Sequence, residues 1–416
     1  MSKVKNTNLA KQGKMKIEMA AAQMPVVSQL HEEFKKQQVF AGVTIAACLH
    51  ITKETAVLLR ALKAGGATVA ACGSNPLSTQ DDVAAALAKD GINIFAWRGV
   101  SDEQYYWCLN KVLDFEPQIT IDDGADLISL IHKKRKGLIK KIWAGQEETT
   151  TGIIRLKAMA KAGALKYPVI AINDTPTKHL FDNHYGTGQS TMDGLLRATN
   201  ILLAGKTVVV GGYGDCSSGI ALRSKGLGAR VIVTEVQDLP ALKAAMDGFE
   251  VMPMIKAAPQ GDVFITATGD RDVLVGNHIK KMKDGAILGN SGHFNVEINV
   301  PDLEKLARSK RTVRNELVEY TLKDGKRIYL IAEGRLMNLA AAEGHPSAVM
   351  DLSFADQALA SAWIVKNYKG MKNTVHEVPA EIDARVAKLK LKLMGVNIDT
   401  LTPAQKKYLA SWTEGT

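Results

Sequence analysis

The feature that most constrains the fold is a repeated alternation between short apolar segments and segments with helical patterning. The apolar segments are rich in β-branched residues, which is typical of strands buried on both faces of a sheet. They span residues 43–49, 67–72, 93–97, 118–122, 168–172, 207–212, 231–235, 262–267, 286–290 and 328–332. Intervening segments such as 53–63 and 80–89 suit helices. This alternation predicts the α/β class, with doubly wound parallel sheets.

One sheet rarely holds so many strands, so we expect two α/β domains within the 416 residues. The polar, turn-rich segment 174–188 predicts the break between them, and a helix over 190–203 follows. The segment 377–416 has an amphipathic pattern that predicts a helical C-terminal arm. Inside it, the alternating lysines and leucines of 388–393 also fit a strand, but the continuation of the pattern favours a helix.

Composition and charge limit the function classes. No apolar run approaches the roughly 18–20 residues that span a bilayer, and the N-terminus lacks the apolar core of a signal peptide. We therefore expect a cytoplasmic protein with no membrane partner and with its four cysteines reduced. The net charge of +10 is dispersed, and the basic run at 133–141 has no interleaved aromatic residues. This favours a solvated helix face over a nucleic-acid footprint and leaves acidic small-molecule partners open.

The most specific local motif is a strand, a glycine-rich turn, a helix and a second strand. The turn holds Gly212 and Gly214, and the second strand ends in Glu235, 23 residues after Gly212. Glycines let the backbone approach a pyrophosphate, and the helix N-terminus supplies N–H donors. An acid at Glu235 suits a ribose 2′-OH and disfavours a 2′-phosphate, which predicts NAD over NADP. Ser217 replaces the third glycine of the fingerprint, and the alternative is a glycine-rich turn in an ordinary sheet.

Two polar clusters, at 48–55 and 122–126, lie where predicted strands end, and 147–152 is a third polar turn. Open α/β sheets bind ligands outside the carboxyl ends of their strands, so the clusters predict one ligand-binding crevice. Taken singly, each cluster also fits N-caps, turns and solvated acids, and Thr52 fits a helix N-cap. No histidine–cysteine spacing typical of zinc and no GxSxG motif is present, so we expect no metal site.

Lys178 and Asp182 are four residues apart, so a helical turn would place them side by side. They could form a surface ion pair. Alternatively, Lys178 could be a desolvated lysine with a lowered pKa that serves as a base. His293 and His345 each lie on a glycine-rich turn after a predicted strand. A lone histidine is usually structural, but both lie in the half of the chain that carries the dinucleotide motif.

Together these motifs resemble the S-adenosylhomocysteine hydrolase family. The resemblance runs from IEMAAAQMP at 17–25 to YLASWTEGT at 408–416, in the family's order and near its spacing. The motifs between these ends are ACLHITKETAVL, SNPLSTQD, DDGADL, EETTTG, TKHLFDNHYG, GYGDCSSG, TEVQDLPALKAAMDG, GHFNVEI and AEGRLMNLAAAEGHP. The short ending is similar to the archaeal and thermophilic-bacterial branch, because it lacks the tail with which the longer branch reaches a neighbouring subunit's NAD.

The resemblance implies a domain organisation and an assembly. It implies a substrate-binding domain at 1–180 and 340–376, an NAD-binding Rossmann domain at 181–339 and an oligomerisation arm at 377–416. The chain would thus re-enter the first domain near residue 340, which the residue pattern alone does not indicate. The family assembles as homotetramers.

The resemblance also implies a reaction, the reversible hydrolysis of S-adenosyl-L-homocysteine to adenosine and L-homocysteine with tightly held NAD. A thioether is a poor leaving group, but oxidation of the ribose 3′-OH makes the 4′-H acidic. Removing it expels homocysteine, water adds to the enone, and NADH restores the alcohol, so no net redox change occurs. This chemistry needs a base at O3′, a base at C4′ and an acid/base at the 5′ side.

The resemblance assigns roles to residues. Glu148, Lys178 and Asp182 would hold O2′ and O3′ and tune the lysine for proton removal, and Asp123, His50 and His293 would serve the 4′ and 5′ side. The substrate would also contact Thr52, Glu54 and His345. NAD would be held by Thr149, Thr150, Thr151, Asn183, Gly212, Gly214, Asp215, Cys216, Ser217, Ser218, Gly219, Glu235, Ser291, Gly292, His293, Asn338 and His345. Two departures stand out: Thr187 replaces a frequent cysteine, and Ser217 and Ser218 replace a glycine and a basic residue.

Two alternatives remain open, S-inosylhomocysteine as the substrate and a catalytically silent, NAD-binding regulatory homologue. All positions implied in the chemistry are present, which favours the enzyme. An ionised Glu54 can only accept hydrogen bonds, so it suits the exocyclic amine of adenine better than the carbonyl oxygen of hypoxanthine. Glu54 could instead turn outward and leave the base to backbone groups.

Overall fold

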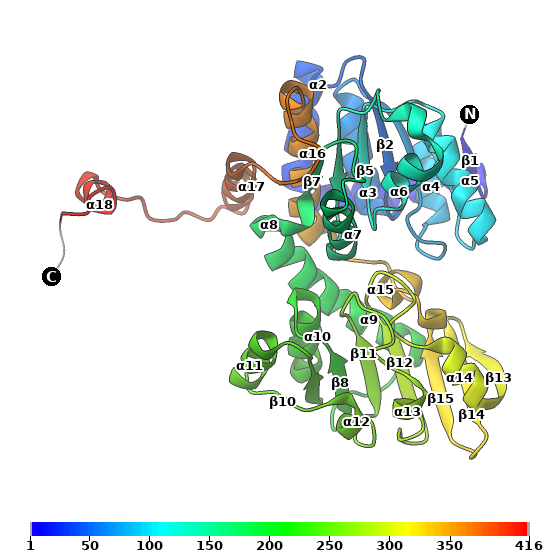
Figure 1. Cartoon of the computed structure of the whole chain (residues 1–416). Helices are drawn as coiled ribbons and strands as arrows, with labels where there is room; N and C mark the ends of the chain where they lie inside the picture. The colour runs from blue at the N-terminus through cyan, green and yellow to red at the C-terminus, as the bar shows by residue number, and fades with distance from the viewer. Residues whose placement is uncertain (1, 414–416) are drawn as a thin grey trace.

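The first half of the chain forms a parallel sheet. The computed structural model describes residues 2–413 and contains two sheets of eight strands, each covered by helices (Figure 1). The first sheet has the order β1-β4-β3-β2-β5-β6-β7-β16, and every pair in it is parallel. Its strands are β1 (Lys3–Val4), β2 (Thr44–Cys48), β3 (Thr68–Cys72), β4 (Asn93–Ala96), β5 (Ile119–Asp122), β6 (Ala144–Glu147), β7 (Val169–Ala171) and β16 (Val375–Glu377).

Helices connect and cover these strands. They are α1 (Ala10–Ala22), α2 (Pro25–Gln37), α3 (Lys53–Ala64), α4 (Asp81–Lys89), α5 (Asp102–Leu113), α6 (Asp126–Lys134), α7 (Thr150–Lys161) and α16 (Ser347–Asn367), with 3-10 turns at Thr7–Leu9, Lys136–Leu138 and Ile172–Asp174. The predicted cap at Thr52 is confirmed, because its side chain accepts a hydrogen bond from the Thr55 N–H and so starts α3 directly after β2.

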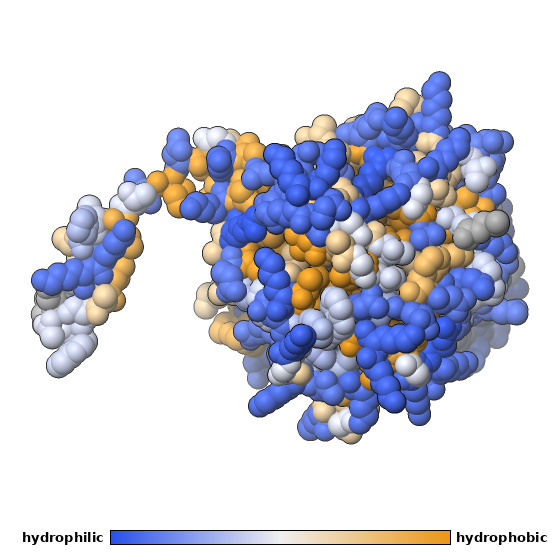
Figure 2. All heavy atoms as spheres, turned by 90° about the horizontal axis from the view of Figure 1, so that it is seen from above, coloured by the Kyte–Doolittle hydropathy of each residue, from blue (hydrophilic) through white to orange (hydrophobic). Residues whose placement is uncertain are grey.

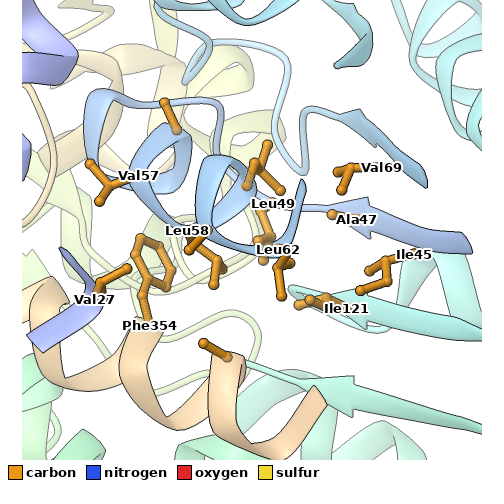
Figure 3. Close-up of a cluster of buried hydrophobic side chains, with 14 of the residues drawn as sticks. Val27, Ile45, Ala47, Leu49, Val57, Leu58, Leu62, Val69, Ile121 and Phe354 are labelled. Atoms are coloured by element: carbon orange, nitrogen blue, oxygen red, sulfur yellow. The ribbon is translucent and has the colours of Figure 1, made fainter. Parts of the chain in front are cut away.

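A late segment of the chain completes the core of the first sheet. Figure 3 shows Leu58 and Leu62 of α3 between the sheet residue Ile45 and Phe354 of α16. Helix α16 packs beside α2 and α3, and β16 pairs with β7 at the edge of the sheet. The chain therefore returns to the first sheet after it has built the second.

The second sheet has the order β10-β9-β8-β11-β12-β15-β14-β13. It is parallel from β10 to β15 and ends in antiparallel pairs of β14 with β15 and β13. The strands are β8 (Thr207–Gly211), β9 (Arg230–Thr234), β10 (Glu250–Val251), β11 (Val263–Thr266), β12 (Ala286–Asn290), β13 (Ala307–Arg314), β14 (Leu317–Leu322) and β15 (Arg327–Ile331). Its helices are α9 (Thr187–Thr199), α10 (Asp215–Gly226), α11 (Asp238–Met246), α12 (Met254–Ala257), α13 (Gly276–Ile279), α14 (Val300–Leu306) and α15 (Met337–Ala340), with a 3-10 turn at Ala332–Gly334.

The expected fold class is confirmed, and each predicted strand is present with ends that shift by at most one residue. The sequence did not predict β1, β6, β10, β13, β14 or β16. Strand β6 escapes the apolar pattern because it carries buried polar residues, and β13 is an exposed, basic edge strand. The antiparallel hairpin at the edge is therefore an addition to the predicted parallel sheet.

The connection between the two sheets is helical, whereas we predicted a turn-rich break at 174–188. Helix α8 (Pro176–Lys178) leads into a π-helical segment (His179–Gly186) that continues as α9. Helix α9 thus begins at 187 rather than at the predicted 190. A β-carbon on Gly219 would lie 1.9 Å from His184 O, so this glycine lets α10 pack directly on the π-helical backbone. Such packing overrides the weak helix propensity of the segment.

The C-terminal arm contains two helices, α17 (Ala380–Leu393) and α18 (Pro403–Leu409), with no helix between them. The predicted helix over 388–393 is confirmed. Val386 anchors α17 in the first core, and the chain beyond it projects from the body with apolar side chains along it (Figures 1 and 2). Met394, Ile398 and Trp412 are among its exposed side chains. Residues 414–416 of the predicted arm and residue 1 of the predicted first domain lie outside the described residues.

Two further observations bear on the expectations from composition. All four cysteines are free thiols. Among the residues that the structure describes, no helix combines the length and the hydropathy needed to cross a membrane.

Candidate active site

One cavity of about 360 Å³ lies between the two sheets, at the carboxyl ends of their strands. Its wall follows strands β2, β5, β6 and β7 on one side and β8, β11 and β12 on the other. This is where parallel sheets bind ligands, so the predicted crevice is present. The predicted site residues in its wall are His50, Thr52, Glu54, Asp123, Glu148, Thr149, Thr150, Thr151, Lys178, Asp182, Asn183, Gly214, Asp215, Cys216, Ser291, Gly292, His293, Asn338 and His345.

Lys178 lies in this wall among four oxygen atoms. Its Nζ is 3.2 Å from Asp182 Oδ2 and 3.4 Å from Glu148 Oε1. It donates hydrogen bonds to Asn183 Oδ1 at 2.7 Å and to Asn173 Oδ1 at 3.2 Å. All five residues are buried, so the ammonium group is held in one position.

Of the two alternatives that the sequence left open for Lys178, the one with a lowered pKa is wrong. Burial lowers the pKa of this lysine, but the carboxylates of Asp182 and Glu148 raise it by more, and the net shift is upward. Lys178 is therefore neither a surface ion pair nor a lysine with a lowered pKa. It is a buried ammonium, and it can act as a base only after it has passed its proton to a neighbour.

Asp182 is fixed on both carboxylate oxygens. Ser353 donates to Oδ2 at 2.8 Å, and His345 Nδ1 is hydrogen-bonded to Oδ1. Burial raises the pKa of Asp182, but Lys178 and His345 lower it much further, to well below the usual range. Asp182 is thus the permanent counter-charge of the lysine.

Glu148 differs from Asp182 in its pKa. Burial raises the pKa of Glu148 to about 8, against the opposing effect of Lys178. Gln357 Nε2 donates to Glu148 Oε2, whereas Oε1 has no hydrogen-bond partner among the described residues. Glu148 can therefore gain or lose a proton near neutral pH.

A second titratable group of residues lies across the cavity. His50 Nε2 is 3.0 Å from Asp123 Oδ2, and His293 Nδ1 is 3.6 Å from Asp123 Oδ1. The other ring nitrogen of His50 is hydrogen-bonded to Ser78 at 2.7 Å. Burial lowers the pKa of His50 to about 4, against the effect of Asp123, so its imidazole is neutral at physiological pH and able to accept a proton.

The ligand atoms of His50, Asp123 and His293 lie within 4.8 Å of one another, a spacing that could also hold a metal ion. The sequence led us to expect no metal site, and that expectation stays a prediction.

Gly124 brings the two halves of this second group together. A β-carbon at this position would lie 2.2 Å from His293 Nε2, and its φ of +101° is strained for any other residue. Glycine thus lets the histidine of the second sheet approach the Asp123 turn of the first. The sequence DDGADL is therefore one of the places where the two domains meet.

The predicted dinucleotide turn has the expected local structure. Strand β8 ends at Gly211, the turn Gly212–Gly214 follows, and α10 starts without a side-chain cap. Glu235 directly follows β9, and its carboxylate accepts from the Tyr213 N–H at 2.8 Å. The acid and the turn are therefore neighbours, as the fingerprint requires.

Five predicted cofactor residues lie outside the cavity wall: Gly212, Ser217, Ser218, Gly219 and Glu235. Ser217 is buried, and its hydroxyl donates to Ala267 O at 2.7 Å, so the serine ties α10 to the end of β11. Ser218 is hydrogen-bonded to His184 at 3.1 Å. These contacts give Ser217, Ser218 and Gly219 packing roles beside the turn.

The residues present fit NAD. The uncapped start of α10 offers free N–H groups of the kind that bind a pyrophosphate. The Asn338 side chain lines the cavity, and its Oδ1 has no hydrogen-bond partner within the described part of the chain. That oxygen could accept a hydrogen bond from a bound group such as a carboxamide. Thr149, Thr150 and Thr151 line the same cavity from the side of the first sheet.

Sequence reasoning missed several residues that contact the site. Asn173 binds Lys178 and could have been found, because it directly follows a predicted strand. Ser347, Ser353 and Gln357 of α16 bind Glu54, Asp182 and Glu148. The only sequence feature that could have revealed these three residues is the spacing of polar residues within an otherwise apolar helix.

The fold and the cavity together define an enzyme of the α/β class that binds a dinucleotide beside proton-transfer groups. Residues 1–146 match the family described as S-adenosyl-L-homocysteine hydrolase, and residues 183–344 match the NAD binding domain of S-adenosyl-L-homocysteine hydrolase. The chain belongs to the S-adenosyl-L-homocysteine hydrolase family, and its cofactor is NAD.

Curated relatives match over the full length. The S-inosyl-L-homocysteine hydrolase of Methanocaldococcus jannaschii is 58% identical over 416 residues, which is 100% of both chains. The adenosylhomocysteinase of Aquifex aeolicus is 58% identical over 414 residues, 99% of each chain. The adenosylhomocysteinase of Sulfurisphaera tokodaii is 58% identical over 414 residues, 100% of this chain and 99% of its own.

Proposed function

We propose that the protein catalyses the NAD-dependent, reversible hydrolysis of S-adenosyl-L-homocysteine to adenosine and L-homocysteine. The observation that carries the proposal is one cavity that joins a buried lysine with two carboxylates, a neutral histidine beside an aspartate, and a dinucleotide turn. A catalytically silent homologue would not need a buried lysine between two carboxylates, because such groups are costly to bury.

The lysine group acts on the ribose hydroxyls. Asp182 and Glu148 hold O2′ and O3′, and Lys178 removes the proton from O3′. NAD bound beside the dinucleotide turn would supply the acceptor for the hydride of C3′ and the donor that restores the alcohol. A ketone at C3′ makes the 4′-H acidic, so a second base is required.

The histidine group acts at the 4′ and 5′ side. The imidazole of His50 is neutral and can take up a proton, and the adjacent carboxylate of Asp123 stabilises the charge that then develops on the ring. His293 reaches the same carboxylate from the second sheet. These groups take the 4′ proton, protonate the departing thiolate and deprotonate the water that replaces it. General acid–base groups of this kind typically contribute about 10²–10⁴ in rate.

Glu54 supports adenine as the base. Its Oε1 accepts from Ser347 Oγ at 2.6 Å and lies 3.2 Å from Lys53 Nζ. The residue is buried and lines the cavity rather than turning outward. An ionised acceptor suits the amine of adenosine and opposes the carbonyl oxygen of inosine.

The second candidate substrate is S-inosyl-L-homocysteine. It is favoured by the relative of Methanocaldococcus jannaschii, which is as similar to this chain as the two adenosylhomocysteinases are. Ser347 bears on the choice, because a hydroxyl can turn to donate to a carbonyl oxygen. The ratio of kcat/KM for the two thioethers separates the candidates.

The domain roles follow from the same cavity. We propose that residues 1–180 and 340–376 bind the substrate and that residues 181–339 bind NAD. The position of α16 and β16 against the first sheet supports the assignment of 340–376. Residues 377–416 form the oligomerisation arm, and the exposed apolar side chains on the projecting part support this role.

We further propose a cytoplasmic homotetramer whose partners are small molecules, with no nucleic-acid or membrane partner. Free cysteines support a reducing compartment. Size measurement in solution tests the tetramer, and deleting residues 396–416 should shift the assembly to smaller species.

The function is tested by mixing the purified protein with S-adenosyl-L-homocysteine and a thiol reagent. The expected result is equal release of adenosine and homocysteine. Absence of thiol release by protein that holds NAD would contradict the proposal and favour the silent homologue.

A further inference from the structure

Residues 351–361 of helix α16 are all buried, yet the helix presents three hydrogen-bond donors to the active site. Each binds a different carboxylate: Ser347 binds Glu54, Ser353 binds Asp182 and Gln357 binds Glu148. Gln357 differs from the two serines because its partner is the carboxyl group whose protonation changes near neutral pH.

Two oxygens without a hydrogen bond flank this contact. Gln357 Nε2 donates to Glu148 Oε2, while Gln357 Oε1 has no hydrogen-bond partner in the described part of the chain. Glu148 Oε1 makes no hydrogen bond within the described residues either, although it forms an ion pair with Lys178 Nζ at 3.4 Å. Buried acceptors without a donor are costly, so a role for them is expected.

An amide suits a carboxyl group in both protonation states. Its NH₂ donates to a carboxylate, and after rotation of the amide its carbonyl oxygen accepts from a carboxylic acid. The free Oε1 of Gln357 provides that second capacity. The contact can therefore persist when Glu148 gains a proton.

We propose that Gln357 is a positioning residue that keeps Glu148 Oε1 facing Lys178 and lets Glu148 exchange a proton with the lysine during turnover. The proposal rests on the proposed function. In the first step an N–H bond of the Lys178 ammonium breaks and an O–H bond forms at Glu148 Oε1, which leaves a neutral amine and a neutral acid. The amine then takes the proton of the substrate O3′ hydroxyl. When the alcohol is restored, both protons move back.

The surroundings allow this exchange. The charged groups that face Glu148 are Lys178 on α8, Asp182 on the π-helical segment and Asp123 after β5. Lys178 favours the ionised form of Glu148, and the two aspartates together with burial favour the neutral form, so the pKa of Glu148 is about 8. Asp182 stays ionised throughout and balances the lysine when it is charged.

The test is the pH profile of kcat for Gln357→Met, which removes both hydrogen-bonding capacities at similar length. A carboxylate that loses a donor has a higher pKa, and a Glu148 that already carries a proton cannot take the proton of the lysine. We expect the acidic limb of the profile to move up by about one to two pH units, with activity recovering at alkaline pH. A substitution that only disturbed packing would lower kcat equally at every pH.

Matched variants complete the experiment. Ser361→Ala, one turn further along α16, loses a hydrogen bond to Gln146 and should leave the profile in place. Gln357→Glu, nearly isosteric, places a second acid against Glu148 and should move the limb at least as far as Gln357→Met. In a Glu148→Gln background, Gln357→Met should produce no further shift.

The outcomes separate the two proposals. A wild-type protein without hydrolysis contradicts the proposed function. If the wild-type protein hydrolyses the substrate but the acidic limb of the kcat profile does not move in either Gln357 variant, the role of Gln357 is overturned and the proposed function stands. If Gln357→Met fails to bind NAD or to fold, the Gln357→Glu profile decides.

Discussion

Replacing Lys178 with methionine should damage both turnover and stability, and the stability loss should depend on pH. The substitution keeps most of the side-chain volume and removes the charge between Asp182 and Glu148, which lie 3.2 and 3.4 Å from Nζ. Turnover should fall by at least about 10²–10⁴, the usual contribution of a general base. The stability effect follows from the two carboxyl groups that stay behind.

The magnitude can be worked from the burial of the pair. Lys178 and Asp182 have side-chain exposures of 6% and 2%, so water screens them little. Removing one partner of a buried ion pair typically costs about 3–5 kcal/mol, because the other charge is left uncompensated. Because the pKa of Asp182 is lower in the folded protein than in the unfolded chain, its ionised form stabilises the fold at every pH above the unfolded-state pKa. This stabilisation is lost as the pH falls through the lower pKa of the folded state.

The sign of the pH dependence follows. In Lys178→Met the pKa of Asp182 rises, so the orphaned carboxyl can take up a proton and relieve its burial. The difference in unfolding free energy between wild type and variant should therefore be largest at alkaline pH and should narrow as the solution becomes acidic.

Urea unfolding followed by tryptophan fluorescence measures this difference. Four of the five tryptophans lie in or next to the strands and helices of the first sheet: Trp97, Trp107, Trp143 and Trp363. The control is Lys157→Met, which breaks an ion pair with Asp174 at 3.0 Å whose lysine is 57% exposed. Such surface pairs contribute roughly 0–1 kcal/mol. Equal destabilisation by the two substitutions, or near wild-type turnover in Lys178→Met, would refute the reasoning.

Three further substitutions test other parts of the site. Gly124→Ala should push His293 away and lower kcat by about 100-fold while the fold is retained, because a displacement of about 1 Å can reduce the rate by that factor. A kcat close to that of the wild type would mean that this close contact is not needed for catalysis. Glu235→Gln should raise the affinity for NADP relative to NAD, measured by the mass of the nucleotide that copurifies, because it removes the charge opposed to a 2′-phosphate. Glu54→Gln should narrow the preference for the adenosyl over the inosyl thioether in kcat/KM, because an amide can also donate.

Much of the fold could be predicted because its strands are buried on both faces and therefore read as apolar runs. Strand β6 is equally buried but carries Gln146 and Glu147, whose burial depends on partners elsewhere in the chain. Gln146 is hydrogen-bonded to Ser361 of α16, and Glu147 accepts from the Gly124 N–H. No local pattern reports such contacts, so the strand went unpredicted.

The candidate site likewise has features that the sequence predicted and features that it did not. Clusters at strand ends were predictable, because the topology of a parallel sheet brings those ends together. The pKa of Lys178 was not, because it depends on the balance between burial and two carboxylates at specific distances. The π-helical segment was not predictable either, since its helical conformation is set by packing on Gly219 and α10.

The central claim is that the protein oxidises the ribose 3′-OH and restores it within each turnover. The most direct measurement is rapid mixing of the NAD-containing protein with S-adenosyl-L-homocysteine while the near-ultraviolet absorbance of reduced nicotinamide is followed. The account predicts a transient rise that decays as adenosine and homocysteine accumulate, with the total NAD unchanged, and no rise with the 3′-deoxy thioether. Release of homocysteine from the 3′-deoxy thioether at the normal rate, or turnover without any reduced nicotinamide, would contradict it.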